Sequence, residues 1–248
     1  MNALQRFGAQ SWAVILLFAA WEGWVAWKGF NAIVLPRPSA ALMDVLRNAG
    51  DYARPAGATI GTALAGLALG MAFGGGLAIA GWFSRVLQGV LTPLTILFSS
   101  VPVVTIIPIL ARIFGYEGGT VLVVVVVISF FPAFVFTTAG LRDLPPLSGD
   151  LFRVLGGSGR RTLLLLALPA AVPSLCVALR IAAAHAILAA MVAEYLMGTG
   201  GLGFMLADAR HDFKMERAIG ASLVAIALSV ALYALAHRLE AWVRERWR

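Results

Sequence analysis

Charged side chains are scarce in this chain of 248 residues. Only 12% of the residues are Asp, Glu, Lys or Arg, whereas 60% are hydrophobic. Soluble domains carry roughly 25% charged residues, so a water-soluble fold could not cover this much apolar surface. The lipid bilayer must act as the solvent for most of the chain. We therefore predict an all-α polytopic membrane protein.

Residues that hold metals or perform catalysis are equally rare. The chain has three histidines and one cysteine, and it contains no GxxxxGK[ST], HExxH, CxxC or GxSxG motif. One cysteine, Cys176, cannot form a disulfide within the chain, and scattered histidines do not make a zinc site. We predict no catalytic residue, no metal site and no cofactor bound by this chain. An energy source, if one is used, must belong to another protein.

The net charge of +7 permits two interpretations. Basic proteins attract nucleic acid. However, 17 of the 19 cations are arginine and most flank apolar runs, where cations anchor and orient a membrane protein. We expect contact with membrane lipid and none with nucleic acid.

Apolar runs predict about six transmembrane helices. A helix needs roughly 17–25 apolar residues to cross a bilayer, and we interpret the first run as a retained span because no small-x-small cleavage site follows it. The runs are Ser11–Trp27, Ala58–Phe83, Val86–Ile113, Thr120–Leu141, Leu163–Met197 and Ala218–Ala236.

Prolines interrupt two of these runs. Pro93, Pro102 and Pro108 break the third run. The fifth run would extend roughly 50 Å as one helix and contains Pro169 and Pro173. Since proline disrupts helical hydrogen bonding, we predict a kinked or interfacial lead-in followed by a span from about residue 172.

Cation placement predicts that both termini are cytoplasmic. In that orientation ten cations lie in inner segments and eight in outer segments, with Arg180 inside a run. The inner cations are packed into shorter loops, as the positive-inside rule prefers.

Small and polar residues shape the outer segments and the second run. Ser39 is a plausible N-cap for a short amphipathic helix over Ala40–Asn48 at the outer interface. Gly66, Gly70 and Gly74 follow GxxxG spacing, which favours close packing within the chain over a dimer seam.

The inner loop between residues 142 and 161 predicts a short helix. Ser148 can cap its start, with Asp150 near the positive end of the helix dipole. Leu151, Val154 and Leu155 make one apolar edge, and Gly156–Gly157 ends the helix. An isolated helix this short is marginal in water, so it needs a surface to dock against. The alternative is an ordinary polar loop.

This loop resembles the Glu-Ala-Ala signature of permease subunits in bacterial ABC importers. In that signature an acidic-Ala-Ala triplet is followed by three residues, a glycine, nine residues and an Ile-x-Leu-Pro segment. Asp150, Gly156 and Leu166–Pro169 fall on those positions. Asp replaces Glu, and Leu151 and Phe152 replace the two alanines.

Four other segments extend the resemblance in chain order. LPRPS (35–39), SSVPVVTIIPILARIFG (99–115), LPAAVPSLCVALRIA (168–182) and AEYLMGTGGLG (193–203) are similar to the branch that serves sulfonate, taurine, nitrate and pyrimidine-precursor importers. The resemblance implies a type I (MetI-like) importer permease in a bacterial inner membrane, importing a small polar or anionic solute. It also implies a second permease copy as a homodimer, a cytoplasmic ABC ATPase dimer that binds ATP and Mg, and an extracytoplasmic substrate-binding protein.

The resemblance implies a coupling helix at about residues 144–158. It divides the chain into an N-terminal span with its outer helix (1–54), a permease core (55–236) and a cytoplasmic basic tail (237–248). The residues implied in ATPase contact are Asp150, Leu151, Phe152, Arg153, Leu155, Gly156 and Pro169.

Polar residues inside apolar runs are candidates for the translocation pathway. Charges there are costly and usually face protein or water, and hydroxyls beside helix-breaking prolines can line a cavity. Arg180 and Glu194 lie ~21 Å apart along one helix, so a structural role between helices stays open for each. The candidates are Ser99, Ser100, Pro102, Thr105, Arg180 and Glu194.

Two other classes of membrane protein remain as alternatives. A secondary transporter would need a coupling-ion site in repeated halves, and the sequence shows no convincing internal repeat. A non-transporting scaffold would show neither solute uptake nor a specific ATPase partner.

Overall fold

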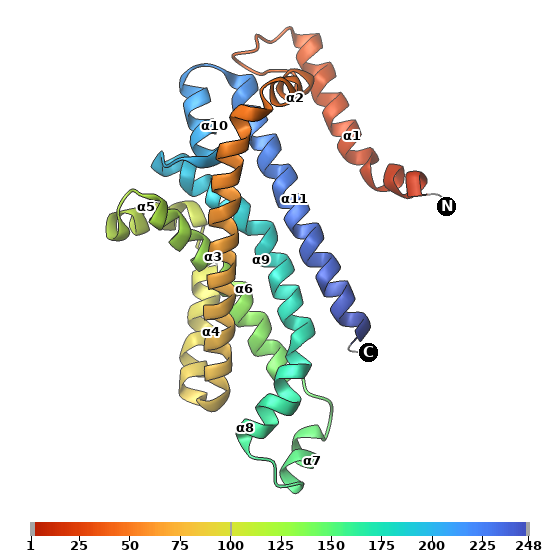
Figure 1. The fold of residues 1–248 in the computed structure, drawn as a ribbon, viewed down its shortest axis with the longest axis vertical. Helices are drawn as coiled ribbons and strands as arrows, with labels where there is room; N and C mark the ends of the chain where they lie inside the picture. The colour runs from red at the N-terminus through yellow and green to blue at the C-terminus, as the bar shows by residue number, and fades with distance from the viewer. Residues whose placement is uncertain (1–2, 100, 247–248) are drawn as a thin grey trace.

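The computed structural model describes residues 3–99 and 101–246. Within these residues the secondary structure is helical, which confirms the predicted all-α class (Figure 1). The helices are α1 (Ala3–Lys28), α2 (Pro38–Arg47), α3 (Ala49–Phe83), α4 (Arg85–Ser99), α5 (Val103–Phe114), α6 (Gly118–Arg142), α7 (Ser148–Val154), α8 (Gly159–Thr162), the π-helix η1 (Leu163–Ala167), α9 (Leu168–Met197), α10 (Gly201–His211) and α11 (Met215–Arg246).

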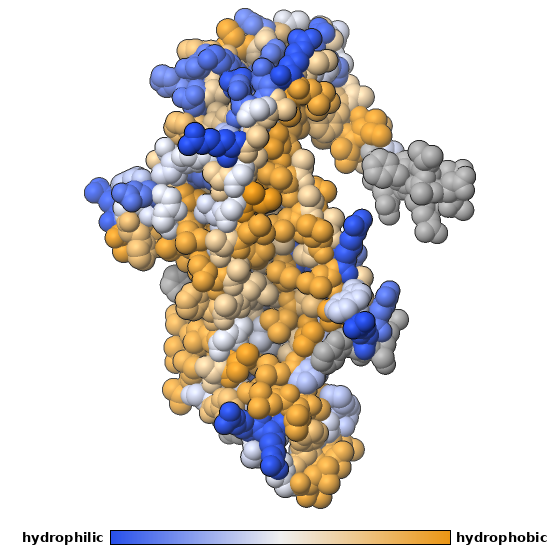
Figure 2. All heavy atoms as spheres, viewed as in Figure 1, coloured by the Kyte–Doolittle hydropathy of each residue, from blue (hydrophilic) through white to orange (hydrophobic). Residues whose placement is uncertain are grey.

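The helices form an elongated bundle around α3, α6 and α9. α2 and α10 lie at one end of the bundle, and α7 and α8 lie at the other (Figure 1). α11 packs along α9, α5 projects sideways, and α1 leaves the bundle. Hydrophobic residues cover most of the middle of the molecule, and hydrophilic residues gather most densely around the α2 and α10 end (Figure 2). This distribution fits a protein surrounded by lipid.

Four helical segments are long and apolar enough to cross a membrane. They are Ala49–Phe83, Gly118–Arg142, Gly159–Met197 and Met215–Arg246. The expected count of about six therefore depends on α1 and on the shorter pair α4 and α5 in addition to these four.

The valine-rich α6 illustrates why the bilayer dictates helices. Its sequence VLVVVVVISFF is rich in β-branched residues, which lose side-chain freedom in a helix. In lipid, however, every backbone N–H and C=O must be satisfied inside the segment, which a helix achieves. The environment overrides the intrinsic preference.

Glycines on α3 allow α6 to approach closely. A Cβ at Gly66 would lie 2.5 Å from Val125 Cβ, and one at Gly70 would lie 2.5 Å from Ser129 Cβ. At Gly74 it would lie 2.5 Å from the backbone oxygen of Phe130. The predicted packing of this glycine series within the chain is confirmed, since small residues supply the van der Waals contact that holds membrane helices together.

The third apolar run is two helices that meet at Pro102. α4 ends at Ser99, and α5 begins at Val103 with Pro102 as its N-cap. Pro93 and Pro108 lie inside helices. Of the three predicted breaks, only the one at Pro102 occurs.

The fifth run is one continuous helical segment, so the predicted break at Pro169 and Pro173 is wrong, whereas a kink there stays a prediction. The helical segment Gly159–Met197 has 39 residues. The π-turn η1 (Leu163–Ala167) directly precedes Pro169, and Pro173 lies inside α9. A wider turn accommodates the missing proline N–H, because π-turns shift the hydrogen-bonding pattern by one residue.

The amphipathic outer helix is present as α2, but Ser39 is not its N-cap. The helix begins at Pro38, a residue suited to the first helical position, and Arg37 is the N-cap. Ser39 instead donates to Glu22 of α1, from its backbone N at 3.1 Å and from its hydroxyl at 2.8 Å. The Glu22 carboxylate thus caps α2 from another helix.

Candidate functional site

The short helix predicted between residues 142 and 161 is present as α7 (Ser148–Val154). Its N-cap is Leu147 in a left-handed conformation (φ 64°), so Ser148 does not cap it as predicted. The Ser148 hydroxyl instead donates to the Pro145 carbonyl at 2.6 Å.

The predicted end of α7 at the glycine pair is confirmed. Gly156 has φ +73°, and its N–H donates to the Arg153 carbonyl at 3.1 Å. The Gly157 N–H donates to the Phe152 carbonyl at 2.7 Å. These two bonds form a Schellman motif, which requires a left-handed residue where glycine is preferred.

An exposed apolar edge distinguishes α7 from an ordinary polar loop. Leu147, Leu151, Val154 and Leu155 are 79%, 57%, 85% and 74% exposed. Asp150 and Arg153 are exposed and paired with each other at 3.3 Å. Exposed apolar groups rimmed by charge are typical of protein-interaction surfaces.

A single helix connects the α7 end of the bundle to the opposite end. α8, η1 and α9 run without interruption from Gly159 to Met197, a length of ~58 Å at the usual rise. Pro169 lies half-buried at the start of α9. It therefore lies on this connecting helix and not on α7 with the other predicted contact residues.

Glu194 joins three helices near the α10 end. Its Oε2 accepts hydrogen bonds from the Thr59 hydroxyl of α3 at 2.8 Å and from the Gly203 N–H of α10 at 3.0 Å. The Thr59 hydroxyl oxygen in turn accepts from the Leu202 N–H at 2.8 Å. Glu194 and Thr59 are buried, so the Glu194 carboxylate supplies the hydrogen-bond acceptor that the buried Thr59 hydroxyl and Gly203 N–H require. We call these four residues the Glu194 cluster.

Two glycines bring α10 against the Glu194 cluster. A Cβ at Gly203 would lie 2.0 Å from the Met191 backbone oxygen, and one at Gly201 would lie 2.4 Å from the Glu194 carboxyl carbon. Gly201 also has φ +92°. α10 begins at Gly201.

A cavity of about 230 Å³ borders the Glu194 cluster. Thr62, Thr199 and Gly200 line it together with Glu194. The Thr199 hydroxyl is buried and has no hydrogen-bond partner among the described residues. Glu194 is thus both a link between helices and part of a polar cavity wall.

Arg180 pairs with α11. Its Nε lies 2.8 Å from Glu240 Oε2, and its NH1 donates to the Tyr233 hydroxyl at 3.4 Å. Glu240, whose side chain is only 5% exposed, also pairs with Arg244 at 2.8 Å. The arrangement supports the interhelical role that the sequence left open for Arg180.

Replacing Arg180 by leucine is expected to destabilise the protein by ~3 kcal/mol, because removing one partner leaves a buried charge incompletely compensated. At ~2–4 °C per kcal/mol this lowers Tm by ~6–12 °C. The double variant Arg180→Leu/Glu240→Leu removes both charges and should recover most of the loss. Thermal unfolding of the purified chain measures both effects, and a single variant with unchanged Tm and uptake would exclude a role for Arg180.

The other pathway candidates lie at the junction of α4 and α5. Ser99 ends α4, Pro102 caps α5, and the Thr105 N–H donates to the Pro102 carbonyl at 2.9 Å. Ser100 lies outside the described residues. The structure does not bring the polar candidates to one point, since Arg180 and Glu194 lie ~21 Å apart along α9.

Ion pairs also order the α2 and α10 end. The Arg217 NH2 donates to Asp51 Oδ2 at 2.8 Å, and Arg217 Nε lies 3.8 Å from Asp44 Oδ2. The Tyr52 hydroxyl donates to the same Asp44 carboxylate. A cavity of about 480 Å³ lined by Asp51, Arg217 and parts of α10 opens beside this cluster.

Comparison with known proteins identifies the chain's family. The profile of the family described as "Binding-protein-dependent transport system inner membrane component" matches residues 66–248. The chain belongs to this family. It is therefore a permease subunit of an ABC importer for small solutes, and a multi-pass protein of the inner membrane.

Relatives of this permease include proteins with named solutes. A probable ABC transporter permease protein of Haemophilus influenzae is 30% identical over 88% of this chain and 89% of its own length. The formylaminopyrimidine transport permease protein ThiX of Halalkalibacterium halodurans is 31% identical over 59% of each chain. The taurine transport system permease protein TauC of Escherichia coli is 24% identical over 92% of this chain and 86% of its own.

Sequence reasoning missed several residues of these sites. It assigned Glu240 to a basic tail, although α11 continues through Arg246. Glu240 and Arg244 lie four residues apart, and a Glu-Arg pair at this spacing indicates a helix. Sequence reasoning also missed Thr59, whose partner Glu194 lies 135 residues away in the chain. No local pattern could have joined those two.

Proposed function

We propose that two copies of this permease form the translocation pathway of an ATP-driven importer. Its solute is small and polar or anionic, of the class to which taurine and formylaminopyrimidine, the named solutes of the relatives, belong. An extracytoplasmic binding protein delivers the solute to the end bearing α2 and α10. The charged residues and the 480 Å³ cavity of that end support the choice of docking face.

The exposed apolar edge of α7 carries this proposal. A seven-residue helix that presents Leu151, Val154 and Leu155 to solvent is marginal alone. A groove of a cytoplasmic ATPase would bury this edge. ATP and Mg are then bound by the ATPase, and this chain binds neither. Among the described residues, no group of three or more His, Cys, Asp or Glu side chains is placed to hold a metal ion.

The continuous helix from Gly159 to Met197 supplies the coupling route. A displacement of α7 would move this helix as a rigid body and reach the Glu194 cluster at its other end. Rigid-body helix movement of this kind is a common basis of alternating access.

Reconstitution tests the proposal directly. The permease should co-purify with an ATPase encoded beside it and should take up solute into proteoliposomes only with ATP, that ATPase and the binding protein. Uptake by the permease alone, driven by an ion gradient, would indicate a secondary transporter. Failure to associate with any ATPase and absence of uptake would indicate a scaffold.

Labelling tests the proposed orientation, in which both termini and α7 are cytoplasmic. In a Cys176→Ala background, Arg160→Cys should react with an impermeant maleimide only after the membrane is opened. Lys214→Cys, between α10 and α11, should react in intact cells. The reverse pattern would invert the topology.

A further inference from the structure

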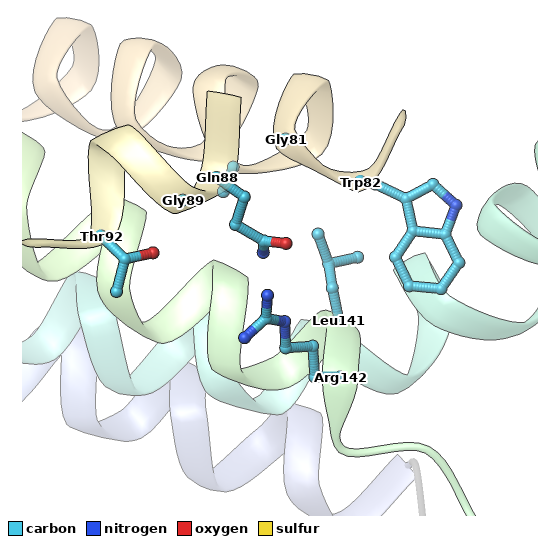
Figure 3. A pocket seen from close by; sticks show the side chains of 8 residues that line it. Gly81, Trp82, Gln88, Gly89, Thr92, Leu141 and Arg142 are labelled. Atoms are coloured by element: carbon cyan, nitrogen blue, oxygen red, sulfur yellow. The ribbon is translucent and has the colours of Figure 1, made fainter. Parts of the chain in front are cut away.

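A cavity of about 570 Å³ lies between the end of α3, the start of α4 and the end of α6. Arg142, the last residue of α6, and Gln88 of α4 extend their side chains into it toward one another (Figure 3). Thr92 lines the same space, one turn further along α4. The volume is typical of small-molecule sites, which span roughly 300–1,000 Å³.

Arg142 is an uncompensated cation at this cavity. Arg153, Arg180 and Arg217 pair with carboxylates, whereas no described carboxylate lies within ion-pair distance of Arg142. A guanidinium presents planar N–H donors that match the oxygens of a carboxylate, sulfonate or phosphate group.

The rest of the cavity suits the same kind of group. The Gln88 amide and the Thr92 hydroxyl can each donate to an oxygen. Ala78 and Leu141, both buried, form an apolar part of its wall. Arg142 and Thr92 are exposed at the mouth of the cavity, where an anion could reach them without displacing buried side chains.

We infer that this cavity binds a compact oxyanion, held by Arg142 and completed by Gln88 and Thr92. The anion is either a free solute or the phosphate of an anionic lipid headgroup. The free-solute source rests on the proposed function, whereas the lipid source does not. Because Arg142 directly precedes the segment leading to α7, a bound anion would join α4 to α6 beside the coupling helix.

Trp82 lines the cavity and provides a readout. The full-length chain in phosphatidylcholine nanodiscs is titrated with sodium sulfate at constant ionic strength, and the signal of a Trp82→Phe variant is subtracted. A saturable change in Trp82 fluorescence is expected. Arg142→Gln should weaken the apparent affinity by about tenfold, which corresponds to loss of one charged contact. Arg112→Gln, which removes an exposed cation of α5, should leave the affinity unchanged.

A second variant tests binding in the cavity without changing the charge of the protein. A Cβ at Gly89 would meet no atom within 4 Å, so Gly89→Leu should add apolar volume to the lining of the cavity without a clash at Cβ. This variant should fold normally and abolish the sulfate response. A full response in Gly89→Leu would overturn the site.

A measurement in anionic lipid shows whether the bound oxyanion is a free solute or a lipid headgroup. In phosphatidylglycerol nanodiscs, native mass spectrometry should show lipid retained by the wild type and lost in Arg142→Gln if the headgroup is the ligand. A saturable sulfate response assigns a free anion, and retained lipid alone assigns the headgroup. If neither probe gives a signal that depends on Arg142, the inference is wrong. Because these measurements need no ATPase, their failure is distinct from failure of the proposed importer function.

Discussion

Replacing Glu194 by leucine is expected to be the most damaging single change to the fold. The variant removes the acceptor for the Thr59 hydroxyl and the Gly203 N–H, both of which are buried. Each buried donor left without a partner costs ~1–3 kcal/mol. The combined loss of ~2–6 kcal/mol should lower Tm by at least ~4 °C or abolish a monodisperse purified species.

The matched variant Glu194→Gln separates the acceptor from the charge. Glutamine keeps a side-chain oxygen that can accept both hydrogen bonds. If Glu194 serves to join α3, α9 and α10, the Gln variant should retain nearly wild-type stability. If the charge itself serves transport, the Gln variant should fold but lose uptake.

Thr59→Val tests the same cluster from α3. In the wild type the Leu202 N–H donates a hydrogen bond to the Thr59 hydroxyl oxygen. Valine has a similar shape but no oxygen that can accept this hydrogen bond. A partial loss, smaller than that of Glu194→Leu, is expected in thermal unfolding. Wild-type Tm for both Thr59→Val and Glu194→Leu would exclude the cluster as a stabilising element.

Replacing Gly156 by valine is expected to uncouple transport while leaving membrane insertion intact. Gly156 has φ +73°, a conformation that costs an ordinary residue ~1–2 kcal/mol and a β-branched one more. This cost falls on the Schellman end of α7, which is exposed and far from the core. A shift of this size changes the docking-competent population roughly 5–30-fold.

Uptake in the reconstituted complex should therefore fall about tenfold, with expression and insertion near wild type. Gly149→Ala is the matched control, because Gly149 lies on the same helix, has open space around it and has no positive φ. That control should keep wild-type uptake. Normal uptake by Gly156→Val would count strongly against α7 as the coupling helix.

Several features could be predicted from sequence because their cause is local. The apolar runs predicted α3, α6 and α11, since a bilayer forces such runs into helices. The glycine spacing predicted that α3 packs closely within the chain, and the glycine pair predicted the end of α7. Motif order over most of the chain predicted the family that the profile then identified.

Other predictions were wrong because the same proline or hydroxyl can be accommodated in more than one local structure. Pro169 could end a helix or follow a π-turn, and only packing along α9 selects the turn. Ser39 could cap its own helix or bind another residue, and the nearby Glu22 of α1 decides. Local propensity is the same in both cases.

Composition and motif order alone were enough to predict a helical membrane permease with a short helix between two of its apolar runs. Composition and spacing suffice for that, because the bilayer permits few backbone structures. The packing of the helices was needed to show that Glu194 accepts hydrogen bonds from Thr59 and Gly203, that Arg180 pairs with Glu240, and that Arg142 faces a cavity. A polar group in lipid must find some partner, but the rotation and register of packed helices select which one.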